Sequence, residues 1–218
     1  MRRLALARAP EHPLCETVRT AGWEPLSHAC TRTEATGAPP PEDPAELDGA
    51  VFLSPAGVSC ALPFLPELLP CLATGPGTAA VLEDEGLRVL LPEEPSAEGL
   101  MELVQERFPS GGRFLLVRAE RGRGLLERIS EGTPWSFVPW ITHREAAIRP
   151  LPPLPPCEAL LALSPLQAEL LGPQAGPRLR LAWGRSAAAA FASVGYPALA
   201  FCEPRPDALV RMLTTIQE

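Results

Sequence analysis

The stretch "ATGPGTAAVLEDEG", residues 73 to 86, decides the fold class, because two glycines and a threonine stand where an apolar strand passes into a helical pattern. The first N–H groups of a helix are unpaired and lie at the positive end of its dipole, so such a turn suits an anion. The known phosphate motifs do not fit, since a P-loop lysine is missing and Ala80 stands where the dinucleotide fingerprint needs a third glycine. By itself the stretch predicts a strand, a turn and a helix.

A second stretch, "AWGRSAAAAFASVG" at residues 182 to 195, repeats this pattern with the same spacing between its glycines. The separation of the two copies is about 110 residues, and other features recur at nearly the same separation. The recurring pairs are Gly75 with Gly184, Gly86 with Gly195, Arg8 with Arg118, Ser54 with Ser164 and Gly22 with Gly132. The sequence therefore predicts an internal duplication of a unit half the length of the chain.

Short apolar runs alternate with helical patterns in both copies. Helices are expected at Pro76 to Glu85 and at Ser96 to Arg107, with Ser96 as N-cap. The runs that predict buried strands are Leu4 to Ala7, Ala50 to Leu53, Cys71 to Ala73, Val89 to Leu91, Phe114 to Val117, Cys157 to Leu163, Leu179 to Trp183 and Ala198 to Cys202. This alternation predicts an α/β fold with parallel sheets.

Polar residues follow several of the predicted strands, where ligands bind in open α/β sheets. They are Arg8, Ser54, Gly75, Arg118, Ser164 and Gly184. We expect two lobes around a cleft that binds an anion. Ser54 and Ser164 also fit helix caps, and the two arginines fit either carboxylate clamps or surface ion pairs.

Composition excludes several classes of protein. The net charge of −7 over 218 residues argues against a nucleic-acid partner, and no apolar run is long enough to span a membrane. The apolar run near the N-terminus is too short for the core of a signal peptide, so a cytoplasmic location is expected. The six cysteines lack metal-ligand spacing and are expected to be buried thiols. All 19 basic residues are arginines, so any cationic contact is made by a guanidinium group.

Four stretches together resemble the uroporphyrinogen-III synthase family. They are "AVFLSPAGV", "ATGPGTAAVLEDEGLRVLLPEEPSAEGLMELV", "GRFLLVRAERGRGLL" and "AWGRSAAAAFASVGYPALAFCEPRPDALVRML". The resemblance implies two interleaved Rossmann- or flavodoxin-like lobes with parallel sheets, joined by a two-stranded hinge. Lobe 1 would comprise residues 1–33 and 145–218, lobe 2 residues 36–140, and the hinge crossings residues 34–35 and 141–144.

The resemblance also implies an activity. Enzymes of this family close hydroxymethylbilane, a linear tetrapyrrole, into uroporphyrinogen III with inversion of ring D, in haem biosynthesis. They are cyclising hydro-lyases and use no metal or other cofactor. The implied partner is the small-molecule tetrapyrrole alone, with no nucleic acid and no membrane, and the implied oligomeric state is a monomer.

Candidate site residues come from the matching motifs. Thr78, Trp140 and Thr142 are the implied catalytic residues, although Thr78 also fits a hydrogen-bonding residue at a helix end. The implied substrate-binding residues are Arg8, Ser54, Gly75, Gly77, Arg118, Ser164, Gly184 and Ser186.

The sequence departs from the family at two of these positions. Trp140, in "FVPWIT", stands where the family usually carries a tyrosine, and tryptophan cannot act as an acid near neutral pH. The adjacent His143 has a suitable intrinsic pKa, but a lone exposed histidine is the interpretation we favour. In the second copy, residues 182 to 195, Ala187 stands at the position that corresponds to Thr78, with Ser186 beside it.

Two alternatives to an active synthase stay open. One is a catalytically degenerate homologue that binds a tetrapyrrole or another polycarboxylate anion in the interlobe cleft. The other is a bilobed anion receptor, which the missing export signal disfavours.

Overall fold

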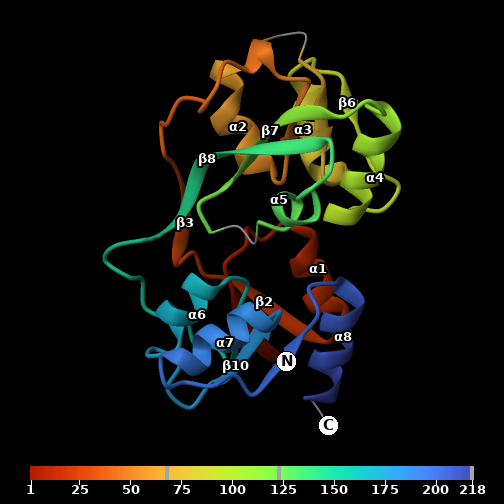
Figure 1. Ribbon diagram of the computed structural model, residues 1–218. Coiled ribbons are helices and arrows are strands. Elements are labelled where there is room, and N and C mark those ends of the chain that lie inside the picture. The colour runs from red at the N-terminus through yellow and green to blue at the C-terminus, as the bar shows by residue number, and fades with distance from the viewer. Residues whose placement is uncertain (67–68, 122–123, 217–218) are drawn as a thin grey trace. The chain divides into compact units, whose positions relative to one another are not determined.

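The chain forms two β-sheets covered by helices in the computed structural model, which describes residues 1–66, 69–121 and 124–216 (Figure 1). Contacts divide the chain into two compact units. Unit 1 comprises Met1–Arg32 and Ala146–Glu218, and unit 2 comprises Thr33–Glu145. Neighbouring strands run parallel through most of both sheets. The predicted α/β class with parallel sheets is confirmed.

Unit 1 has a five-stranded sheet in the order β11-β10-β9-β1-β2. Helices α1 and α8 cover one face and α6 and α7 the other, as Figure 1 shows for the two helix pairs. The strands are β1 (Arg2–Leu6), β2 (Trp23–Ser27), β9 (Ala159–Ala162), β10 (Leu179–Trp183) and β11 (Ala200–Cys202). The helices are α1 (Pro13–Thr20), α6 (Pro165–Leu171), α7 (Arg185–Ser193) and α8 (Pro206–Thr215).

Unit 2 has a six-stranded sheet in the order β3-β8-β7-β4-β5-β6. Helices α2 and α3 cover one face and α4 and α5 the other. The strands are β3 (Thr31–Ala35), β4 (Gly49–Phe52), β5 (Cys71–Ala73), β6 (Val89–Leu90), β7 (Gly112–Ala119) and β8 (Trp135–Ala147). The helices are α2 (Pro55–Ala61), α3 (Pro76–Asp84), α4 (Ala97–Arg107) and α5 (Leu125–Ile129), with single 3₁₀ turns at Pro44–Glu46 and Leu62–Phe64.

The edge strand β3 departs from the expected parallel pattern. Thr36 N–H donates to Thr142 O, and Ile148 N–H donates to Cys30 O. Residue numbers therefore rise along one strand as they fall along the other, so β3 lies antiparallel to β8. The unit boundaries at 32/33 and 145/146 fall within these two strands.

The two sheets repeat one plan. In unit 2, β7 and β8 hold the places that β1 and β2 hold in unit 1, and β4, β5 and β6 hold those of β9, β10 and β11. This is the doubly wound, flavodoxin-like arrangement, in which the chain moves first to one side of a central strand and then to the other. In the shared five-strand plan, each unit combines two strands from one sequence copy with three from the other, and unit 2 carries β3 as an additional edge strand.

Matching residues begin and end the repeated helices. Ser54 and its counterpart Ser164 each accept the N–H of the residue three positions on at 3.2 Å, and Ser96 does so at 2.9 Å, so the predicted caps are confirmed. Arg205, the counterpart of Ser96, makes no side-chain capping bond. The turn glycines of both pairs have positive φ, a conformation that favours glycine. The angles are 77° and 75° for Gly22 and Gly132, and 78° and 82° for Gly86 and Gly195.

All six cysteines are free thiols, and five of them are buried as predicted, whereas Cys60 is partly exposed. Burial raises the pKa of Cys71 and Cys202 to about 11. In the described part of the chain, no helix is both long and apolar enough to cross a membrane.

Candidate functional site

Unit 2 brings Ser54 and Arg118 to the carboxyl-end edge of its sheet. Ser54 follows β4 after one intervening residue, and Arg118 lies near the end of the neighbouring β7. From β4 the chain continues to β5 on one side, and from β7 it continues to β8 on the other. The crevice at such a reversal of strand order is where doubly wound sheets bind ligands.

A pocket of about 380 Å³ opens at this edge between α4 and α5. Leu53, Thr74 and Arg118 line it from the ends of three strands, and Glu127 lines it from α5. Arg118 Nε lies 3.2 Å from Glu127 Oε1, and the two side chains are 17% and 25% exposed. Arg118 therefore forms an ion pair, as one of the two alternatives expected, but the pair is largely buried and not on the surface. A bound carboxylate would compete with Glu127 for this guanidinium.

Unit 1 repeats the arrangement at the ends of β1 and β9. Arg8 and Ser164 hold the places of Arg118 and Ser54. A pocket of about 220 Å³ is lined by Arg8, His12, Leu163 and Trp183, among others. Leu163 and Trp183 correspond in the repeat to Leu53 and Thr74, so the duplication has preserved a pair of related pockets.

The two glycine turns differ in backbone conformation. Gly75, before α3, is extended with φ −167°, whereas Gly184, before α7, has φ +96°. Thr78 is buried in the first turn of α3, and its hydroxyl makes no hydrogen bond to other described residues. At the corresponding place in α7 Ala187 is buried, while Ser186 and the first-copy Gly77 are exposed.

Trp140 lies in the core of unit 2. It is 2% exposed, its indole N–H donates to Ala38 O at 2.9 Å, and Phe64 contacts its ring edge to face at 5.6 Å between centroids. The only donor of the side chain is therefore engaged within the unit. The catalytic role implied by the resemblance stays a prediction.

His143 is buried, at 6% exposure, so the expectation of an exposed histidine is wrong. Its Nδ1 lies 2.9 Å from Thr142 Oγ1 and its Nε2 lies 3.4 Å from Ser54 Oγ. Burial lowers the pKa of His143 below its ordinary value of 6.5, which favours the neutral ring. The sequence contains no pattern that would place β8 beside the end of β4, so this contact could not be predicted.

The chain has relatives in one known family. The family model described as uroporphyrinogen-III synthase HemD matches residues 12–133, more than half of the chain. The chain belongs to the uroporphyrinogen-III synthase family. Members of this family are cyclising lyases of porphyrin and haem biosynthesis.

Two solved structures of this family share the fold along nearly the whole chain. Uroporphyrinogen-III synthetase from Helicobacter pylori is 15% identical, with a TM-score of 0.68, over 99% of this chain and 100% of that chain. A mutant uroporphyrinogen III synthase from the extremely thermophilic bacterium Thermus thermophilus is 18% identical, with a TM-score of 0.51, over 100% and 98%. No curated protein sequence gives a significant match. At identities this low, the structural similarity shows a common fold alone.

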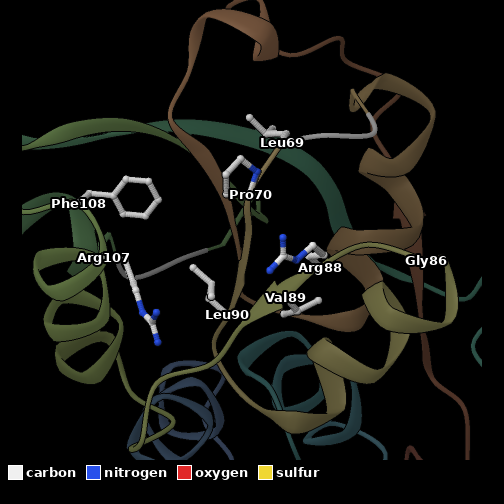
Figure 2. Close-up of a pocket in the computed structure, with 8 residues that line it drawn as sticks. All are labelled: Leu69, Pro70, Gly86, Arg88, Val89, Leu90, Arg107 and Phe108. Carbon is white, nitrogen blue, oxygen red and sulfur yellow. The ribbon is translucent and has the colours of Figure 1, made fainter.

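This family member has a further pocket, of about 580 Å³, at the opposite edge of the unit 2 sheet (Figure 2). Leu69 and Pro70 precede β5, Arg88 precedes β6, and Arg107 and Phe108 precede β7. Because the pocket adjoins the amino ends of these strands, it is separate from the edge that carries the predicted site residues.

The candidate site residues of this family member suit an anion better than a metal ion. Among the residues described, no group of three or more His, Cys, Asp or Glu side chains could hold a metal ion. The candidate site residues offer arginines, hydroxyls and backbone N–H groups, which are donors suited to carboxylates.

Proposed function

We propose that the chain is a uroporphyrinogen-III synthase that cyclises hydroxymethylbilane with inversion of ring D, without a cofactor. The observation that carries the proposal is the family match over residues 12–133. The fold shared with the Helicobacter pylori synthetase and the arginine and serine side chains at both sheet edges support it.

Binding is the first task of such an enzyme, since its substrate is a flexible polycarboxylate. We assign this task to the strand-end edge of each unit, with Arg8 and Ser164 in unit 1 and Arg118 and Ser54 in unit 2. A hydrogen bond to a charged group contributes about 1.5–3 kcal/mol, so a few such contacts suffice to hold a polyanion. Because the net charge of the protein is −7, the molecule as a whole does not attract an anion, and the attraction is confined to these edges.

The reaction then requires the bound linear tetrapyrrole to adopt a single conformation. The substrate hydroxyl leaves with a proton as water, and the resulting cation is attacked by a substituted carbon of the terminal pyrrole. The spiro intermediate breaks one carbon–carbon bond and forms another as ring D inverts, and loss of a proton from the newly bonded pyrrole carbon gives the neutral product, so that the net change is loss of one water. Holding the reacting carbons together accounts for much of the acceleration in such a step, because it removes the entropy cost of the encounter. Oriented donors that stabilise developing charge supply the remainder.

We also propose that the enzyme has two lobes joined by a hinge. The expected hinge at residues 34–35 and 141–144 lies in β3 and β8, which are hydrogen-bonded to each other through Thr36 and Thr142. We assign the hinge to this strand pair. No cofactor is needed for the proposed steps, because neither electrons nor a group is transferred to or from the enzyme.

The test is direct. Freshly prepared hydroxymethylbilane is given to the purified protein, the product is oxidised, and the porphyrin isomers are separated by chromatography. An active synthase yields mainly isomer III, whereas isomer I from spontaneous closure alone refutes the proposal. Heat-denatured protein provides the background rate.

A second candidate function is a catalytically degenerate homologue that binds a tetrapyrrole or another polycarboxylate. The replacement of the family tyrosine by Trp140, whose N–H is already bonded to Ala38, favours this candidate. Isomer I as the sole product, together with saturable binding of uroporphyrin, would support it.

A further inference from the structure

A chain of hydrogen bonds links three side chains at the carboxyl-end edge of unit 2. Thr142 Oγ1 lies 2.9 Å from His143 Nδ1, and His143 Nε2 lies 3.4 Å from Ser54 Oγ. Ser54 Oγ also accepts the Gly57 N–H at 3.2 Å. Thr142 and His143 are 2% and 6% exposed, whereas Ser54 is half-buried. Of these three hydrogen-bonded side chains, only that of Ser54 therefore reaches solvent.

A β-bulge makes this arrangement possible. Arg118 is opposite Ile141 but Ala119 is opposite His143, so Thr142 is an extra residue in β8. Successive strand residues normally point to opposite faces, and a bulge re-aims a side chain. Here it buries two consecutive side chains.

Gly57 lies against the ring of His143. A Cβ at this position would lie 3.5 Å from His143 Cε1 and 3.1 Å from Val117 Cγ1. The equivalent residue of unit 1 is Gln167, whose side chain donates to Thr31 Oγ1 and accepts the Leu163 N–H. The duplicated halves have therefore diverged at this point, and among the described residues a titratable ring is hydrogen-bonded to the serine of unit 2 but not to that of unit 1.

The surroundings select one tautomer of His143. The hydroxyl of Thr142 is buried and has no other hydrogen-bond partner among the described residues. If it accepted from Nδ1–H, its own proton would be a buried donor without an acceptor, which is costly. It therefore donates to Nδ1, and the neutral ring carries its proton on Nε2.

This tautomer fixes the role of the serine hydroxyl. A serine oxygen accepts two hydrogen bonds and donates one. When Nε2–H and the Gly57 N–H take both acceptor positions, the O–H of Ser54 is left to donate toward solvent. We propose that His143 is a positioning residue that holds Ser54 as a hydrogen-bond donor for a carboxylate of the substrate. This inference deepens the proposed synthase function and rests on it for the identity of the ligand.

The tautomer is measured in the ligand-free protein. The chain has only three histidines, so long-range ¹H–¹⁵N spectra of ¹⁵N-histidine-labelled protein near neutral pH contain three ring systems. His143→Gln removes one of them and assigns it. The inference predicts a protonated Nε2 and an unprotonated Nδ1, and the opposite tautomer would overturn it.

Kinetics test the link to Ser54. Loss of a hydrogen bond to a carboxylate in Ser54→Ala is expected to raise KM for hydroxymethylbilane about tenfold with little change in kcat. His143→Leu is expected to raise KM about three- to tenfold, and the double variant is expected to match Ser54→Ala alone. His143→Gln, whose amide N–H₂ can replace Nε2–H, is expected to restore most of the binding.

Ser164→Ala is the matched control, because the equivalent serine caps α6 in the same way but lies next to Gln167. Its effect should add to that of His143→Leu. Additive effects of Ser54→Ala and His143→Leu would overturn the inference. A wild-type protein that makes only isomer I would refute the proposed function and leave the tautomer result standing, so the two failures are distinguishable.

Discussion

Replacement of Trp140 by phenylalanine separates packing from catalysis at the position where the family usually carries a tyrosine. The change removes the 2.9 Å hydrogen bond from the indole N–H to Ala38 O and part of a ring that is 2% exposed. A net hydrogen bond contributes about 0.5–1.5 kcal/mol. The smaller ring adds about 1–2 kcal/mol for lost contacts. We therefore expect the free energy of unfolding to fall by about 1.5–3.5 kcal/mol.

The assay combines urea unfolding with turnover of hydroxymethylbilane at a temperature where both proteins are folded. Trp135→Phe is the matched control, since Trp135 lies in the same strand and its indole N–H donates to Phe108 O at 2.8 Å. If Trp140 acts through packing, both variants lose stability and keep kcat within a few-fold of the wild type. A tenfold or larger loss of kcat confined to Trp140→Phe would refute this reasoning and show that the indole acts on the substrate.

Three further outcomes are expected. Arg118→Gln should raise KM for hydroxymethylbilane about tenfold or more, measured by initial rates, whereas Arg113→Gln at the amino end of the same strand should leave it unchanged; equal effects would contradict the placement of the site. In the native protein a thiol reagent should modify Cys60 alone, since the other cysteines are buried, and rapid reaction of more than one thiol would contradict the burial. Burial lowers the pKa of His143, so the unfolded state binds more protons near pH 6 and the free energy of unfolding should fall as pH drops below about 6.5. His143→Gln should weaken this dependence in urea titrations, and an unchanged slope would contradict it.

Much of the fold could be predicted because its signals are local. The run Cys71–Ala73 is a strand with the bounds expected, and Ser96 caps α4 as expected, since apolar runs and capping residues act on their near neighbours. The strands β2 and β3 carried no such signal. Pro25 lies within β2, which is tolerated at the edge of a sheet, and β3 is formed by the polar stretch "TRTEA".

The candidate site was predictable only in part. Its strand-end residues follow from the position of the strands, because the carboxyl ends of parallel strands share one edge of a sheet. The partners of those residues come from elsewhere in the chain. Burial of His143 beside Ser54 depends on a bulge in β8, which a periodic pattern does not reveal.

The central claim is that this chain directs ring closure to isomer III. The most direct measurement is the fraction of isomer III formed from a fixed amount of hydroxymethylbilane as the concentration of wild-type protein rises from zero. We expect that fraction to rise from the spontaneous level until isomer III predominates. A fraction that stays at the spontaneous level at every protein concentration would contradict the claim.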